Sequence, residues 1–115
     1  MIIRPEPGEF AVRMTDWTVR EISLPQLKNE PTSRHLCGMV DNVEGRVCSP
    51  IRSFDADSMS FITRSGKFYY VVGPPGGHAD SEYTWARWTD MQGVKSTDYK
   101  DVTEEYYEQG HMADQ

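Results

Sequence analysis

The sequence has few of the residues from which membrane spans and disulfide frameworks are built. None of its apolar runs approaches the roughly 18 residues that cross a bilayer, and the segment MIIRPEPGEF lacks the apolar stretch of a secretory signal. We therefore expect no membrane partner and a cytoplasmic location. Two cysteines and three histidines among 115 residues exclude a disulfide-rich scaffold.

The two cysteines have two readings that the sequence leaves open. Cys37 and Cys48 fall opposite each other if the segment RHLCGMVDNVEGRVC is a hairpin, so a disulfide is geometrically allowed. In a reducing cytosol we expect two buried thiols instead. With His35 and His78 they form a conceivable metal set, but their spacing matches no common zinc pattern. We expect no metal and no cofactor; a small-ligand or metal-binding domain using these residues is the first alternative function.

Motifs of nucleophilic catalysis and phosphate binding are also missing. No GxSxG or comparable pattern frames a serine, and we predict no catalytic residues. The segment GPPGGH, residues 73–78, resembles a phosphate loop only in its glycines, because Pro74 and Pro75 have no N–H donor and no lysine follows. We interpret it as the exit from a hairpin. A small hydrolase with an unrecognised site is the second alternative function.

The negative charge is concentrated in the C-terminal part of the chain. Six acidic residues and one lysine lie within residues 98–115, so this segment carries −5 of the net charge of −6. The nearly neutral remainder argues against direct nucleic-acid binding, which depends on clustered Lys and Arg. An acidic segment favours a partner protein with a basic surface.

The periodic patterns predict an α+β fold. Strand signals occur in WTVREISL (residues 17–24), in two short runs around DNVE, and in the hairpin of residues 59–72. The segment DSEYTWARWTDMQG (residues 80–93) has the cap and stop signals of a helix. We predict a twisted antiparallel sheet of about five strands, with an SH3-like partial barrel as one form of it, and one C-terminal helix.

These elements divide the chain into three parts. Residues 1–16 are predicted to be an irregular N-terminal arm, residues 17–94 a single globular domain, and residues 95–115 an acidic tail that is extended or partly disordered. The tail is predicted to contribute little to folding. No pattern indicates an oligomeric state.

The core is predicted from the largest apolar side chains on the periodic elements. A two-residue turn at Ser65 and Gly66 pairs Phe61 with Tyr70, whereas a three-residue turn with Gly66 in the left-handed conformation shifts the register by one. Trp85, Trp88 and Met91 share one face of the predicted helix. The predicted core residues are Phe61, Phe68, Tyr70, Trp85 and Trp88.

The acidic tail is the predicted binding segment. Aromatic residues between acidic ones are typical of segments that become ordered on a partner. The predicted function is therefore a non-enzymatic protein-binding module or inhibitor acting on a partner with a basic surface. The predicted partner-binding residues are Tyr99, Asp101, Glu104, Glu105, Tyr106, Tyr107 and Glu108.

The segment TRSGKFYYVVGPPG, followed by EYTWARW, is similar to short uncharacterised proteins of proteobacterial genomes and mobile elements. The resemblance covers roughly residues 34–94, and it carries no activity over to particular residues. It implies a bacterial or phage setting. It also favours a small inhibitor directed at a host or phage protein, such as an anti-CRISPR protein.

Overall fold

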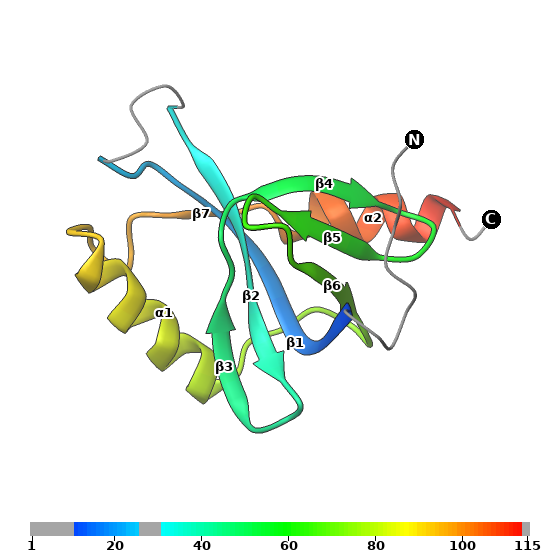
Figure 1. The fold of residues 1–115 in the computed structure, drawn as a ribbon, viewed down its shortest axis with the longest axis horizontal. Coiled ribbons are helices and arrows are strands. Elements are labelled where there is room, and N and C mark those ends of the chain that lie inside the picture. The colour runs from blue at the N-terminus through cyan, green and yellow to red at the C-terminus, as the bar shows by residue number, and fades with distance from the viewer. Residues whose placement is uncertain (1–10, 26–30, 114–115) are drawn as a thin grey trace.

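The computed structural model describes residues 11–25 and 31–113, which form an α+β fold with a mixed sheet and two helices (Figure 1). The strands are β1 (Ala11–Ile22), β2 (Ser33–Val40), β3 (Glu44–Val47), β4 (Ile51–Asp55), β5 (Ser60–Thr63), β6 (Phe68–Val71) and the short β7 (Lys100–Asp101). The helices are α1 (Ala79–Met91) and α2 (Thr103–Ala113).

The sheet is organised around β1, in the order β3-β2-β1-β6-β5-β4. β1 runs antiparallel to β2 and parallel to β6, and β7 pairs with the end of β1 at Arg20 and Glu21. The α+β class is thus confirmed, but the sheet is mixed, has more strands than the five predicted and is accompanied by a second helix. It is open in the described residues, so the SH3-like barrel is not confirmed.

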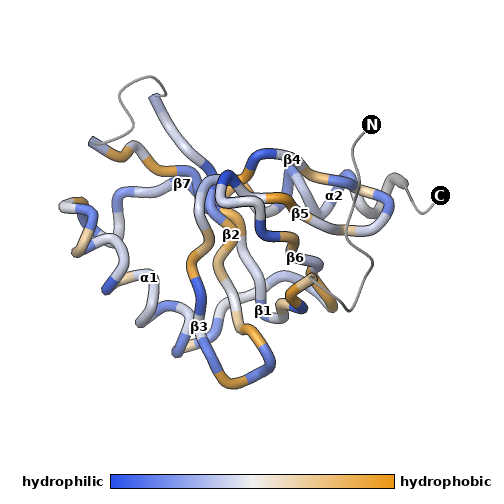
Figure 2. The backbone as a smooth tube through the Cα atoms, in the orientation of Figure 1, coloured by the Kyte–Doolittle hydropathy of each residue, from blue (hydrophilic) through white to orange (hydrophobic). Residues whose placement is uncertain are grey.

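The two helices cover opposite faces of the sheet. In β2, His35 and Cys37 contact α1, while the intervening Leu36 belongs to the cluster that contains Val102 and Tyr106 of the C-terminal segment. A strand covered on both faces is apolar at successive positions. This explains why β2 is buried almost throughout. Figure 2 shows that the strands carry most of the hydrophobic residues, whereas α1 is largely hydrophilic.

The β5–β6 hairpin has the three-residue turn, with Gly66 at φ 89°. Phe61 therefore pairs with Tyr69 instead of Tyr70. Tyr69 is buried and Tyr70 is half-buried, so the prediction of Tyr70 as a core residue was wrong by one position of register. Phe61, Phe68 and Trp85 are buried as predicted.

The β2–β3 hairpin also differs from the expected register by one residue. Asp41 and Asn42 take left-handed φ values of 56° and 60° at the turn, and Cys37 pairs with Val47. Cys48 instead donates its N–H to the Leu36 carbonyl. The cysteines belong to different core clusters and are unpaired thiols. Cys37 and Cys48 are therefore not opposite each other, as the disulfide would require.

The segment between β6 and α1 is the hairpin exit that was predicted. Gly73 has φ 78°, and the loop leads into α1, whose N-cap is His78 instead of Asp80 or Ser81. His78 Nδ1 accepts a hydrogen bond of 3.0 Å from the Asp80 N–H. On α1, Trp85 is buried and Trp88 half-buried, but Met91 is 73% exposed, so the predicted stripe is only partly correct.

The predicted acidic tail is a structural element and not an extended segment. Residues 100–113 comprise β7, Val102 and α2, and Val102, Tyr106 and Gly110 are buried at a helical spacing. A Cβ at Gly110 would collide with the Met59 side chain, which would have to move to admit a larger residue. The periodicity escaped sequence analysis because two of these three inward positions are occupied by tyrosine and glycine. Likewise, residues 11–16 of the predicted arm belong to β1, and residues 1–10 lie outside the described part.

We expect Tyr106→Ala to lower the free energy of unfolding by about 3 kcal/mol, as truncation of a buried aromatic side chain does. Tyr106 is 8% exposed and packs against Phe54 and Phe61. Tyr83, which is 63% exposed on α1, is the matched control, and its truncation should change stability by less than about 0.5 kcal/mol. Chemical denaturation of both variants measures the difference. Equal losses would contradict the packing of α2 described above.

Candidate binding surface

Four acidic residues line the exposed side of the α2 segment, and we call them the acidic stripe. Asp101 lies in β7 just before the helix. Glu108 follows Glu104 by four residues, a spacing that brings two side chains together on a helix surface, whereas the adjacent Glu104 and Glu105 do not face each other. All four are exposed. The residues of the acidic stripe are Asp101, Glu104, Glu105 and Glu108.

The acidic stripe is held on the sheet from its inner side. The Tyr106 ring lies 5.0 Å from the Phe54 ring and 5.5 Å from the Phe61 ring, measured between centroids. Thr103 Oγ1 accepts a hydrogen bond of 2.9 Å from the Val19 N–H, and the Val102 N–H donates to the Val19 carbonyl at 2.9 Å. The acidic side chains are therefore presented by a docked helix and not by a flexible chain.

The three tyrosines predicted to bind a partner are placed differently from the acids. Tyr106 is buried in the core, and the half-buried Tyr107 ring lies 6.3 Å from Trp17. Tyr99 is half-buried against Trp85 at 5.2 Å. The structure thus brings the predicted acidic residues together on one surface, while the tyrosines attach this segment to the body.

One arginine of β2 compensates part of the acidic stripe. Arg34 pairs through Nη1 with Glu105 at 2.6 Å and through Nε with Glu21 at 3.0 Å. Its Nη1 also donates to the Tyr106 hydroxyl at 3.2 Å. No basic side chain in the described ranges pairs with Glu104 or Glu108. The uncompensated charge of the stripe is therefore centred on the outer side of α2.

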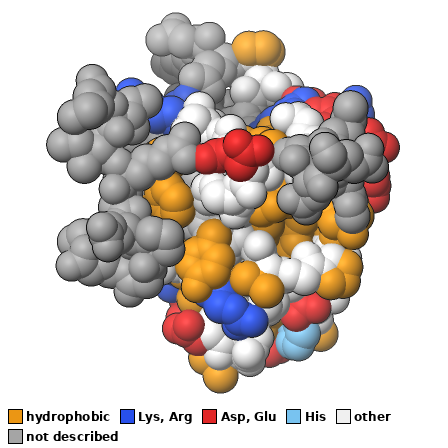
Figure 3. Space-filling view, turned by 90° about the vertical axis from the view of Figure 1, so that its right-hand side faces the viewer, with side chains coloured by type: hydrophobic (Ala, Val, Ile, Leu, Met, Phe, Trp, Pro, Cys, Tyr) orange, Lys and Arg blue, Asp and Glu red, His pale blue; other side chains and the backbone are white. Residues whose placement is uncertain are grey.

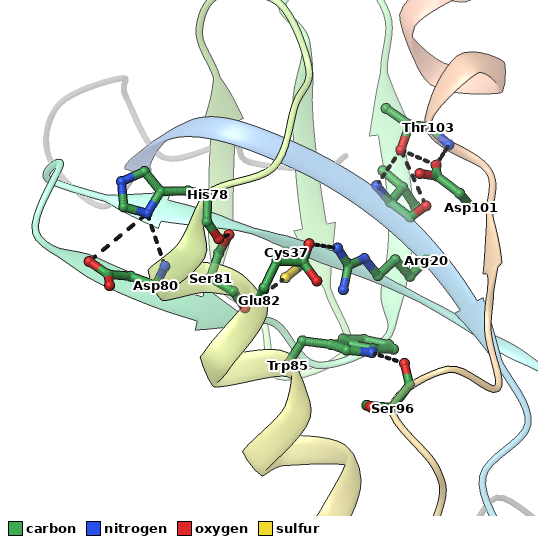
Figure 4. Close-up of polar contacts among 11 residues, drawn as sticks. Arg20, Cys37, His78, Asp80, Ser81, Glu82, Trp85, Ser96, Asp101 and Thr103 are labelled. Carbon is green, nitrogen blue, oxygen red and sulfur yellow. Dashed lines mark hydrogen bonds and ion pairs between the residues drawn. The ribbon is translucent and has the colours of Figure 1, made fainter.

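A second arginine is buried on the face of the sheet that α1 covers (Figure 4). Arg20 is 3% exposed, its guanidinium lies between the Trp85 ring at 4.9 Å and the Tyr99 ring at 4.6 Å, and it pairs with Glu82 of α1. Its Nε and Nη1 have no hydrogen-bond partner within the described chain. The arginine joins β1, α1 and the segment before β7 on the face opposite α2.

A cavity of about 290 Å³ lies at the start of α2. It opens where the edge of β1 is covered by neither β6 nor β7. Three segments that are distant in sequence form its walls, so no local sequence pattern predicts the cavity. The lining residues are Thr18, Pro75, Gly76, Asp101, Thr103 and Glu104.

A serine–histidine pair occurs in β2, but its position favours a structural role. The Ser33 hydroxyl lies 2.7 Å from His35 Nε2, and His35 Nδ1 lies 2.8 Å from the Cys48 carbonyl oxygen. The carbonyl can only accept, so Nδ1 carries the proton and Nε2 accepts from Ser33. Both side chains are buried, and the Trp88 ring lies 4.8 Å from the imidazole. Substrate would have to displace this packing to reach the serine.

The histidines and cysteines considered as a metal set do not converge. Cys37 faces α1, Cys48 belongs to the opposite cluster, and His78 caps α1 at the surface. In the ranges that the structure describes, no three His, Cys, Asp or Glu side chains are grouped as a metal site would require. Burial raises the pKa of Cys37 to about 11 and that of Cys48 to about 12, so both thiols stay protonated at neutral pH.

No family model, curated protein or solved structure matches this chain. Among the described residues, neither helix has the length and apolar character needed to cross a bilayer. The functional argument therefore depends on the geometry and charge of the chain itself.

We expect the buried His35 to make the protein less stable in mild acid. Burial lowers the pKa of His35 below its ordinary 6.5, so the unfolded state binds a proton that the folded state excludes. The stabilising contribution is complete above about pH 6.5 and is lost as the pH falls from there through the folded pKa. Denaturation between pH 7.5 and 5 should show this fall in the parent and a flatter profile in His35→Gln.

The imidazole can also be observed directly. If NMR shows the His35 ring titrating at or above its ordinary pKa in the folded protein, the assigned neutral state is wrong.

Proposed function

We propose that this protein is a non-enzymatic protein-binding module that docks on a basic surface of a partner protein through the acidic stripe. The observation that carries the proposal is the arrangement of four exposed carboxylates in β7 and along the docked helix α2, of which Glu104 and Glu108 pair with no basic side chain in the described part of the chain. Where the basic surface of the partner is itself functional, such docking makes the protein an inhibitor.

Electrostatics supports this assignment. Like charges fixed on one side of an element produce a field that steers an oppositely charged partner and increases its association rate. Figure 3 shows acidic side chains at the upper right edge and at several other places on a face that also carries hydrophobic side chains. Charged groups beside apolar ones suit an interface with a polar rim.

The same charge argues against nucleic acid as the partner. The chain carries −6 overall, and the acidic stripe would meet phosphate groups with repulsion. The two buried free thiols are typical of a reducing compartment, which supports a cytoplasmic setting for the module. That the partner is a bacterial or phage protein is part of this proposal; it follows from the resemblance of residues 34–94 and not from the comparisons with known proteins.

We expect the double variant Glu104→Gln/Glu108→Gln to bind its partner roughly fivefold more weakly at low salt, since each exposed charge contributes modestly. The matched control is Asp41→Asn/Asp90→Asn, which removes the same charge from exposed positions in the β2–β3 turn and α1. The three proteins are used as baits in bacterial lysate. Captured proteins are quantified by mass spectrometry at 50 mM and 300 mM salt, and the strongest is purified for titration.

The proposal requires that a protein with a basic surface is captured by the parent and, in equal amount, by the control variant. The amount captured should fall with Glu104→Gln/Glu108→Gln and at the higher salt concentration. A partner that both double variants bind as tightly as the parent would refute a role for the acidic stripe. Capture that is independent of salt would show that the acidic stripe is not the interface.

A further inference from the structure

We infer that α1 is a pH-sensitive lid, which moves away from the sheet when His35 beneath it takes up a proton. The lid covers the face of β1 and β2 that carries Arg20, His35 and Cys37, and Figure 4 shows the side chains of Arg20 and Cys37 reaching α1. The acidic stripe lies with α2 over the opposite face, so this device goes beyond the proposed function. Opening of the lid would uncover one face of the sheet while α2 stays docked on the other.

Few apolar contacts hold α1 on the sheet in the described chain. Its buried side chains are Ser81, Trp85 and Thr89, of which only the tryptophan is large and apolar. Trp88 is half-buried, and most of the other positions of the helix are exposed. Elements with so few buried apolar contacts are among the first to open locally in a folded protein. Release of α1 therefore requires less free energy than opening of the core strands.

The chain on both sides of α1 can act as a hinge. Gly77 immediately precedes the N-cap His78, and Gly93 follows the C-cap Gln92 with φ 77°. Hinges are commonly a few residues at the ends of an element that absorb changes of φ and ψ. The Gly76 N–H is bonded to the Trp17 carbonyl, so the loop before Gly77 stays attached to β1 when the helix moves.

His35 lies between the sheet and the second half of α1, in hydrogen bonds that require a neutral ring. It is 1% exposed, and its ring centroid lies 4.8 Å from that of Trp88. Nδ1 donates to the Cys48 carbonyl, and Nε2 accepts from the Ser33 hydroxyl. A proton on Nε2 would point at this hydroxyl, which would have to turn round and accept. The closed lid therefore holds the uncharged imidazole.

The charged groups around His35 also favour its neutral form. Arg64, at the β5–β6 turn, repels a proton on the ring. Arg20 is the partner of His35 in the register of β1 and β2, and it already engages Glu82 of α1. The buried side chains of α1 are uncharged. Burial and, to a smaller extent, Arg64 lower the pKa of His35, although the hydrogen bond to the Cys48 carbonyl acts in the other direction. A proton therefore binds more tightly once α1 has moved away.

The two cysteines report separately on the lid and on the core. The Cys37 thiol donates to the Ser81 carbonyl of α1, whereas Cys48 belongs to the cluster on the opposite face, and both are buried free thiols. A dipyridyl disulfide labels them: the protein sulfur forms a mixed disulfide, and the disulfide bond of the reagent breaks to release thiopyridone. Peptide mass spectrometry gives each labelling rate, divided by the rate of the urea-unfolded chain at the same pH.

We expect the relative rate of Cys37 to rise by up to about tenfold between pH 7.5 and pH 5.5, because an ordinary histidine pKa of about 6.5 favours the open state by that factor one unit lower. His35→Gln should remove the rise, since its amide can keep both hydrogen bonds but takes up no proton. His78→Asn is the matched control: it replaces the exposed histidine that caps α1 by another N-cap residue and should keep the rise.

Urea distinguishes release of the lid from unfolding of the whole chain. At pH 5.5 Cys37 of the parent should react at least about tenfold faster than Cys48, and low urea concentrations should accelerate only Cys48, because the effect of urea scales with the surface exposed. Equal rates with equal urea dependence would overturn the inference by showing that only global opening occurs. A Cys37 rate that is independent of pH, or a rise that persists in His35→Gln, would overturn it as well.

Discussion

The fold depends on how the edge of β1 is hydrogen-bonded in the gap between its two partner strands. β6 covers that edge up to Met14, and β7 begins at Arg20. Between them the Trp17 carbonyl accepts from the Gly76 N–H, and both backbone groups of Val19 bond to the start of α2. A buried backbone group without a partner is costly. This single edge therefore determines where the loop after β6 and the helix α2 must lie.

The candidate surface is a consequence of the same arrangement. The loop and α2 approach β1 from different directions and leave a cavity between them. Because the inner side of α2 is anchored by Val102 and Tyr106, its acidic residues can only point outward. The acidic residues of this segment lie on the outer side of α2, and the residues that close the core lie on its inner side. The many acidic residues dominate the composition, which is why the segment resembles a solvated tail.

Elements that are determined by nearby residues were predicted from the sequence. Pairings between distant segments were not. The β5–β6 hairpin and α1 have turn and cap residues within a few positions, and both were predicted. The register of the two hairpins depends on backbone φ values that could not be predicted from the sequence. The left-handed residues Gly66 and Asn42 each accompany a shift of one residue in the pairing. The parallel pairing of β1 with β6 has no local signal. In the candidate site, composition predicted the acidic residues, whereas the cavity is formed by three segments that are distant in sequence.

The contact between Val19 and Thr103 joins residues that are 84 positions apart. Most of the intervening chain must be arranged before these two can meet, since closing so long a loop costs conformational entropy before any contact repays it. Collapse of the hairpins around β4, β5 and β6 would come first and leave the rings of Phe54 and Phe61 facing water. Until α2 has docked, Tyr106 does not cover these two rings, and exposed apolar surface of this kind favours self-association.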